Sequence, residues 1–242
     1  MKGLTLLPLD DDIINRVLTL SPDFDSLKAT ILATKAFYGV YKAHPNSIRR
    51  AVAENVVGPA LPQALRAIRY RVPDMGEDSE TEDSDAPEGE TDESAPITNQ
   101  EISKLVENAR MFRGLEDVFS LRCVSVSFGC GLIIMLVNRH KNRKFKKSQL
   151  TYDESLRFQR AIYRLALFSK VFHGTELSEV ISEEDNEAQE FQTRKRREQI
   201  EFLRHFSILD LRQIYTASVF LIELARWAEA GDESNGVLDD DG

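Results

Sequence analysis

An acidic segment from Asp74 to Ala95 divides this 242-residue chain and limits what it can fold into. The segment holds eleven Asp or Glu residues and no Lys or Arg, and its only apolar side chains are Met75, Ala86 and Ala95. So few apolar groups cannot offset the entropy that is lost when a chain becomes ordered. The sequence therefore predicts a helical module at 1–73, a disordered acidic linker at 74–96, a helical domain at 97–230 and a disordered acidic tail at 231–242.

The first part contains apolar residues at helical spacing, and we predict three helices there. The first carries Ile13, Ile14, Val17 and Leu18 on one stripe. The second begins at Ser21 and Pro22, as an N-cap followed by proline, and ends before His44-Pro45. The third runs roughly from Ser47 to Val57 and stops at Gly58-Pro59. Three short helices cannot bury stripes this wide among themselves, so some apolar surface should face a partner or the rest of the chain.

Two stretches of this first part carry a family resemblance. They are the start Leu7-Pro8-Leu9-Asp10 and the run FDSLKATILATKAFYGVYKAHPNSI at 24–48. Together they resemble the fungal, basidiomycete-type F-box-like domain proteins. The resemblance implies that the module docks on the Skp-type adaptor of a cullin-RING ubiquitin ligase. The adaptor-docking residues that it implies are Leu7, Pro8, Ile14, Val17 and Leu18.

Three aspartates, Asp10, Asp11 and Asp12, lengthen the start of this module compared with the usual family pattern. Carboxylates at a helix N-terminus are stabilised by the helix macrodipole, so we interpret the run as capping. The Leu-Pro pair precedes the helix and has little to pack against. We therefore expect Pro8→Ala to act as an interface change and Val17→Ala as a core change.

The second part contains repeated helix-start signals. Thr98 with Glu101, and Thr151 with Glu154, each form a capping-box pattern, and Ser207 with Asp210 opens a last helix after one at about 186–206. These four helices suggest an antiparallel bundle or an orthogonal array, with Trp227 as a packing anchor. The expected inner face of the last helix comprises Leu211, Ile214, Tyr215, Ser218, Ile222 and Ala225. Segments such as SQLTYDES and FLRHFSILDLRQIY also resemble the region that follows the F-box in the same fungal group.

The stretch from Leu121 to Ser148 does not fit this pattern. It holds no capped helix and places an apolar run from Val124 to Val137 between two predicted helices. The run has about fourteen residues, fewer than the roughly twenty needed to cross a bilayer. A β-hairpin around Gly129-Cys130-Gly131 is one interpretation. We favour another, in which residues 123–138 are a translated, unspliced intron, and sequencing of the spliced transcript tests it.

Apart from the two stretches that carry the family resemblance, the sequence has no motif of known chemical function. Its four histidines lie far apart, and Cys123 and Cys130 form no CxxC pair. We therefore predict no enzyme activity, no catalytic residue, no metal and no cofactor. Pro8 and the three aspartates interrupt the apolar start, which argues against a signal peptide and for a cytoplasmic or nuclear protein without a membrane segment.

The net charge of −9 becomes +7 once the sixteen acids of the linker and the tail are set aside. Basic clusters lie at Arg139–Lys147 and at Arg194–Arg197. Since almost no aromatic residues accompany them, we interpret them as solvated helix faces or as partners of the acidic linker. The favoured function is a protein-interaction adaptor that links a Skp-type protein to an unidentified target. The alternatives are a helical scaffold with no ligase role and a nuclear or nucleic-acid-associated protein.

Overall fold

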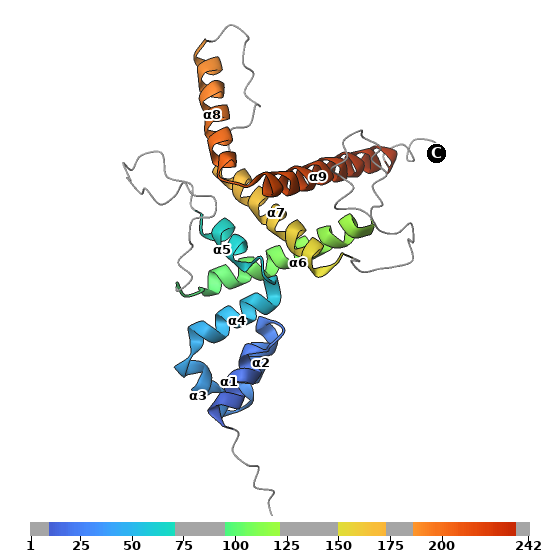
Figure 1. Ribbon diagram of the computed structural model, residues 1–242. Coiled ribbons are helices and arrows are strands. Elements are labelled where there is room, and N and C mark those ends of the chain that lie inside the picture. The colour runs from blue at the N-terminus through green and yellow to red at the C-terminus, as the bar shows by residue number, and fades with distance from the viewer. Residues whose placement is uncertain (1–9, 71–94, 122–149, 173–185, 236–242) are drawn as a thin grey trace, which may run out of the picture. The chain divides into compact units, whose positions relative to one another are not determined.

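A computed structural model describes residues 10–70, 95–121, 150–172 and 186–235, and all regular secondary structure in these ranges is helical (Figure 1). This confirms the predicted all-α class. The helices are α1 (Asp11–Thr19), α2 (Phe24–Ala33), α3 (Lys35–Ala43), α4 (Pro45–Val57), α5 (Leu61–Arg69), α6 (Asn99–Leu121), α7 (Tyr152–Val171), α8 (Asn186–Arg204) and α9 (Ile208–Asn235). They form two compact units. The first comprises α1 to α5 with α6 as far as Met111, and the second comprises α6 from Phe112 with α7, α8 and α9.

The core of the first unit forms where α1 packs against α3 and α4, α2 packs against α3, and α5 packs against α4. Its most deeply buried large side chains are Ile14, Leu18, Ile48, Val52, Leu61, Leu65, Ile97 and Leu105. Each fully buried side chain of this size contributes roughly 1.5–3 kcal/mol relative to an exposed one. Short helices that are marginal alone are therefore held by this shared burial.

The second predicted helix is wrong in its extent, because the structure contains two helices there. Asp23, not Ser21, caps α2, and its carboxylate accepts a hydrogen bond of 2.7 Å from the Ser26 N–H. Thr34 then adopts extended backbone angles and ends α2. Its hydroxyl accepts from the Phe37 N–H at 3.3 Å and so caps α3. The polar side chain of Thr34 thus offers the backbone a local alternative to a continuous helix.

Helix α5 was not expected from the sequence. The predicted stop at Gly58-Pro59 is real, since Gly58 has φ 82° and its N–H donates to the Glu54 carbonyl at 2.7 Å. A new helix then begins at Leu61 and buries Leu65 and Ile68 on one side. The stop is therefore a sharp turn between two helices of the same core.

All three predicted helix starts of the second part are confirmed. The Thr98 N–H donates to Glu101 at 2.6 Å, and the Glu101 N–H returns a bond of 3.2 Å to Thr98 Oγ1. Thr151 and Glu154 form the same reciprocal capping box, and the Asp210 N–H donates to Ser207 Oγ at 3.1 Å. These signals are local in sequence, which explains why the sequence alone located them.

Aromatic rings hold the second unit together. Phe119 of α6 stacks on Phe158 of α7 with centroids 4.6 Å apart, and both rings contact Phe220 of α9. The Phe202 ring of α8 lies 5.8 Å from Phe168 of α7 and 5.7 Å from Phe172, the C-cap of α7. Helix α7 therefore meets α6, α8 and α9 through aromatic contacts.

The expected inner face of α9 is only partly correct. Ile214 is buried as expected, and Ala217 and Phe220 are buried as well, whereas Tyr215 and Ile222 are exposed. Trp227, expected as a packing anchor, is 71% exposed. Helix α9 is apolar around most of its circumference, so periodicity did not fix which side packs. The predicted linker as far as residue 94, the tail from residue 236, the 123–138 insert, Arg139–Lys147 and the Leu7-Pro8 pair lie outside the described residues. Residues 231–235, which the sequence predicted as part of the tail, form the end of α9.

Candidate protein-docking surface

Helix α1 begins in an acidic run. Asp10 is the N-cap in extended conformation, and its carbonyl accepts from the Ile14 N–H at 3.0 Å. Asp11 and Asp12 occupy the first turn, and the side chains of all three aspartates are exposed. Their charges lie beside the positive end of the helix dipole, which favours this start for α1. The side chain of Asp10 makes no capping hydrogen bond, so the three aspartates stabilise the start of α1 through the interaction of their charges with the helix dipole.

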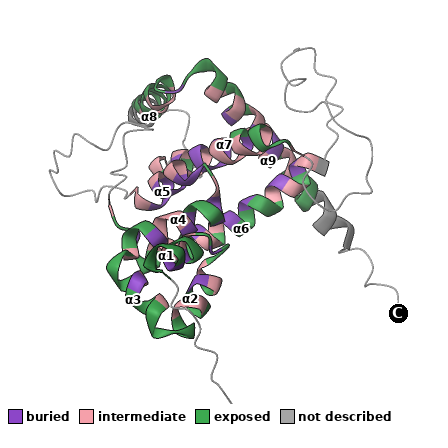
Figure 2. Ribbon diagram, turned by 60° about the horizontal axis from the view of Figure 1, so that its bottom comes forward, coloured by how far each residue is buried: buried purple, intermediate pink, exposed green. Residues whose placement is uncertain are grey.

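Helix α1 has apolar residues on two sides. Ile14 and Leu18 are 1% and 0% exposed and form part of the core. Ile13, Val17 and Leu20, which we call the α1 stripe, are 50%, 44% and 73% exposed. Their i, i+4, i+7 spacing places them on one side of the helix, about 100° from the buried pair. Figure 2 shows buried and exposed residues on this same helix.

The end of α1 is fixed by α4. The Asn55 amide donates to the Thr19 carbonyl at 2.8 Å and to the Ser21 carbonyl at 2.9 Å. The Leu20 N–H donates to the Arg16 carbonyl at 3.0 Å, which continues the last turn through Leu20. Backbone on both sides of Leu20 is thus held by hydrogen bonds. The α1 stripe is a preformed surface, and a preformed surface loses less entropy on binding.

The five predicted docking residues do not come together on one open surface. Ile14 and Leu18 are core residues, Val17 is exposed, and Leu7 and Pro8 lie outside the described residues. The expectation that Val17→Ala acts as a core change is wrong, because nearly half of this side chain is open to solvent. The core contacts the side of α1 that is centred on Ile14 and Leu18. Val17, three residues after Ile14, lies at the edge of that side and is therefore partly exposed.

Sequence reasoning did not single out two exposed members of the α1 stripe, Ile13 and Leu20. The signal was present, since Ile13, Val17 and Leu20 recur at i, i+4 and i+7. It runs beside the Ile14–Leu18 pair, so the two rows form one broad apolar band in the sequence. Only contacts with α3 and α4 separate the covered row from the open one.

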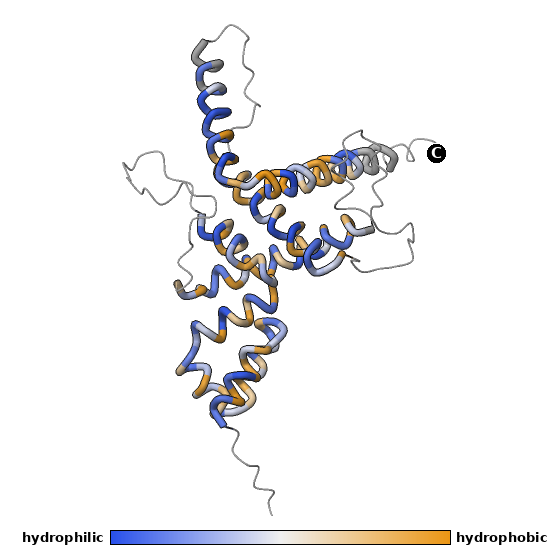
Figure 3. The backbone as a smooth tube through the Cα atoms, viewed as in Figure 1, coloured by the Kyte–Doolittle hydropathy of each residue, from blue (hydrophilic) through white to orange (hydrophobic). Residues whose placement is uncertain are grey.

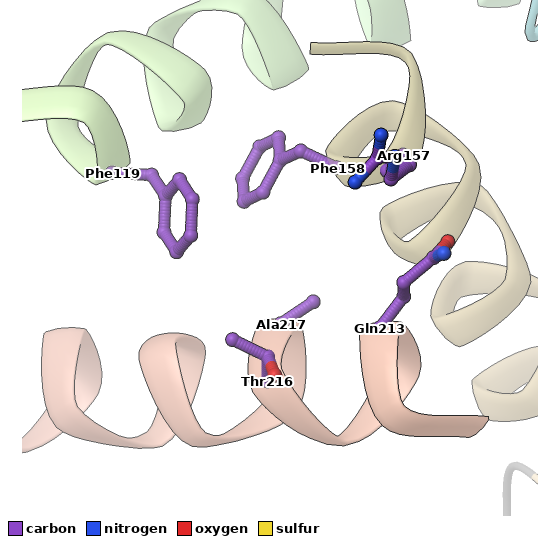
Figure 4. A pocket seen from close by; sticks show the side chains of 6 residues that line it. All are labelled: Phe119, Arg157, Phe158, Gln213, Thr216 and Ala217. Atoms are coloured by element: carbon purple, nitrogen blue, oxygen red, sulfur yellow. The ribbon is translucent and has the colours of Figure 1, made fainter. Parts of the chain in front are cut away.

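A small hollow in the second unit is a poor site for a small molecule. It spans about 210 Å³ with its open mouth and is lined by Phe119, Arg157, Phe158, Gln213, Thr216 and Ala217. Figure 4 shows the two phenylalanine rings facing α9, which contributes Thr216 and Ala217. Because this volume includes open solvent, the enclosed space is smaller still, whereas ligand sites usually enclose about 300–1,000 Å³. The hollow is better explained as a packing gap beside the aromatic core.

The described ranges contain no group of three or more His, Cys, Asp or Glu side chains that could hold a metal ion. His44 and His205 are both exposed and lie in different units. No described helix is both long and apolar enough to span a membrane.

The basic cluster on α8 is largely exposed and partly neutralised within its own helix. Glu198 lies 3.8 Å from Arg194 and 3.3 Å from Lys195, at helical spacings of four and three residues. Exposed pairs of this kind contribute at most about 1 kcal/mol, so they mark a solvated face. This agrees with the interpretation that we favoured for Arg194–Arg197.

Comparisons with protein-family models, with curated proteins and with solved structures gave no match. The interpretation of the α1 stripe as a candidate docking surface therefore rests on its geometry alone. It combines three exposed apolar side chains, a rigid backbone and adjacent carboxylates, which is a surface that can bind another protein and has no group for covalent chemistry.

Proposed function

We propose that this chain is a protein-interaction adaptor of the F-box-like kind, whose α1 stripe docks a partner protein. The partner that the sequence resemblance implies is the Skp-type adaptor of a cullin-RING ubiquitin ligase. The remainder of the chain then binds a target protein. One observation supports this proposal most directly, which is that α1 buries Ile14 and Leu18 completely while it exposes Ile13, Val17 and Leu20.

Exposed apolar side chains in a row are typical of interaction surfaces. A single exposed apolar side chain is ordinary, whereas three apolar side chains on one side of a short helix form a continuous patch. The nearby Asp11 and Asp12 favour a partner whose matching groove carries basic residues at its edge. An amphipathic helix laid in an apolar groove is a common recognition mode, and α1 has the required spacing.

The test is binding of the full-length chain to a recombinant fungal Skp-type adaptor, measured by isothermal titration calorimetry. Val17→Ser and Leu20→Ser should each weaken binding about tenfold or more if these residues are interface anchors. Circular dichroism should show an unchanged helix content, because both side chains are exposed. Binding should persist at high salt, since apolar contacts are not screened.

Leu32→Ser is the matched control. Leu32 is also a strongly exposed leucine of the first unit, but it lies on α2 and outside the α1 stripe. Its substitution should leave adaptor affinity within about twofold, as expected for a residue outside an interface. Folded wild-type chain that does not bind the adaptor at micromolar concentration would remove the ligase role and leave the scaffold alternative.

A further inference from the structure

A second exposed apolar row runs along α9, in the other compact unit. Ile208, Tyr215 and Ile222 are 71%, 67% and 53% exposed and recur every seven residues. Residues seven apart drift by only about 20° around a helix, so the three lie on one side over roughly 21 Å. We call them the α9 row. Figure 3 shows hydrophobic residues along much of α9 and a mainly hydrophilic α8.

The α9 row cannot turn inward, because the other side of the helix is already packed. Ala217 and Phe220 are each 2% exposed, and the Phe220 ring lies 5.1 Å from the Phe119 ring. The start of the helix is also fixed, since Asp210 forms a 2.7 Å ion pair with the buried Arg164. The exposed side of α9 is thus set by contacts within its own unit.

The spacing of the α9 row matches the seam of a two-helix coiled coil. With Ile208, Tyr215 and Ile222 at the a positions, the d positions are Leu211, Ser218 and Ala225. None of these three d residues is buried, and two of them are small. Small side chains in a seam let a second helix approach closely. The row is therefore shaped for a helix and not for an extended strand.

The charges beside the row indicate what kind of helix fits. Arg212 lies between Ile208 and Tyr215, and Arg226 lies one turn after Ile222. Both are exposed, and no carboxylate of the described residues forms an ion pair with either. Between Ile208 and Val219, Arg212 is the only charged residue that is exposed. The acidic residues near the row come later in the helix, at Glu223 beside the row and at Glu229 beyond its end.

We propose that the α9 row binds an amphipathic helix of a partner protein that carries carboxylates beside its apolar stripe. The apolar residues of that helix would cover Tyr215 and Ile222, and one carboxylate would pair with Arg212. The proposal goes beyond adaptor docking, because it concerns a different helix in a different unit. It stands whether or not α1 binds a Skp-type protein.

Two other occupants fit less well. A parallel second copy would place Arg212, at an e position, near Ser207 at the g position of the other helix. An antiparallel copy with Tyr215 opposite Ser218 would place Val219 and Leu221 near it, so neither copy supplies a carboxylate. An anionic membrane prefers helices whose polar face is rich in Lys and Arg. The charged residues beside the α9 row instead include Glu223 as well as Arg212, and Glu229 follows Ile222 at the same seven-residue spacing.

The experiment uses the full chain and two fluorescent designed peptides of about three heptads, each with Leu at a and d. One carries Glu and the other Lys at the flanking positions. Fluorescence anisotropy should show binding of the Glu peptide and about tenfold weaker binding of the Lys peptide. Tyr215→Ser and Ile222→Ser should each weaken binding of the Glu peptide about tenfold. Arg212→Glu should reverse the preference between the two peptides.

Leu209→Ser is the matched control, since Leu209 is 65% exposed on the same helix but lies about 100° away from the row. It should change affinity by less than about twofold. Equal binding of the two peptides, or equal weakening by Leu209→Ser, would overturn the proposal.

Concentration-dependent dimerisation that Tyr215→Ser abolishes would assign the row to a second copy. Sedimentation with anionic vesicles that Tyr215→Ser abolishes would assign it to a membrane. Adaptor binding of these variants, measured in parallel, should be unchanged, which separates this test from that of α1.

Discussion

Arg164 is a buried cation whose surroundings determine how α7 meets α9. Its guanidinium lies 2.7 Å from the Asp210 carboxylate and 5.2 Å from the centre of the Phe206 ring. Ser207 donates its hydroxyl to the other Asp210 oxygen at 2.6 Å. Asp210 thus belongs to the cap of α9 and neutralises a charge of α7. A helix-start signal that is visible in the sequence has here a second, tertiary role.

Asp210→Ala should destabilise the second unit by about 2–4 kcal/mol, because it removes the carboxylate that pairs with the buried Arg164 charge at 2.7 Å. The lower end of that range reflects the partial exposure of Asp210. Glu201→Ala is the control, since Glu201 pairs with Arg204 at 2.9 Å on the surface, and it should cost less than about 1 kcal/mol. Urea unfolding followed by circular dichroism measures both. Equal losses for the two variants would contradict a structural role for the buried pair.

Glu101 makes the stability of the first unit dependent on acid pH. Partial burial opposes its charged form, but hydrogen bonds from Arg69 at 2.7 Å and from Thr98 outweigh burial and lower the pKa of Glu101 below its usual 4.5. A carboxyl with a lowered folded pKa stabilises the fold above its unfolded pKa and loses this contribution as pH falls through the folded value. The free energy of unfolding should therefore decrease below about pH 4.5. In Glu101→Gln this decrease should be smaller, and an identical pH profile would count against the assignment.

At the scale of elements, local capping signals decide where helices begin and end. The sequence does not show whether such a signal is strong enough to interrupt a stretch with continuous helical periodicity. Thr34 ends α2 and caps α3 inside a stretch that periodicity alone joins into one helix. Gly58 ends α4 in a backbone conformation that is nearly restricted to glycine, with φ 82° and ψ −166°. The chain can then turn directly into α5.

Two glycine substitutions should have opposite effects on stability. Gly58→Ala should destabilise the first unit by about 1–3 kcal/mol, because alanine is strained at this φ and ψ. Gly39 lies inside α3, and a Cβ added there meets no atom within 4 Å. Gly39→Ala should therefore stabilise the same unit by about 0.5–1 kcal/mol. Thermal unfolding of both variants provides the measurement, and destabilisation by both would show that α3 is not packed as described.

At the scale of the whole molecule, each of the two units has its own core and its own uncovered apolar side. The first exposes the α1 stripe and the second exposes the α9 row. A chain that binds two proteins at once needs two such surfaces, and here they lie on different units. This arrangement suits an adaptor, and it predicts how binding variants should combine.

Val17→Ser and Ile222→Ser should act independently. The first should weaken only binding of the Skp-type adaptor and the second only binding of the Glu peptide. For each ligand the double variant should therefore show the same loss of binding free energy as the corresponding single variant, within about 0.5 kcal/mol, as expected for sites that share no partners. Titration of each ligand in the presence of the other measures the coupling. A change in adaptor affinity when the peptide is bound would mean that the two surfaces communicate.

The sequence by itself determined the helical class and most helix starts, because these depend on residues within one turn of each other. The Thr98–Glu101, Thr151–Glu154 and Ser207–Asp210 pairs are such local signals, and all three form as predicted. Only the tertiary structure decided which side of an apolar helix is covered. Helices α1 and α9 are apolar on two sides, and the covered side depends on partners that are distant in sequence, such as Asn55 for α1 and Phe119 for α9. For that reason Val17, Tyr215 and Trp227 were expected in the core and are exposed.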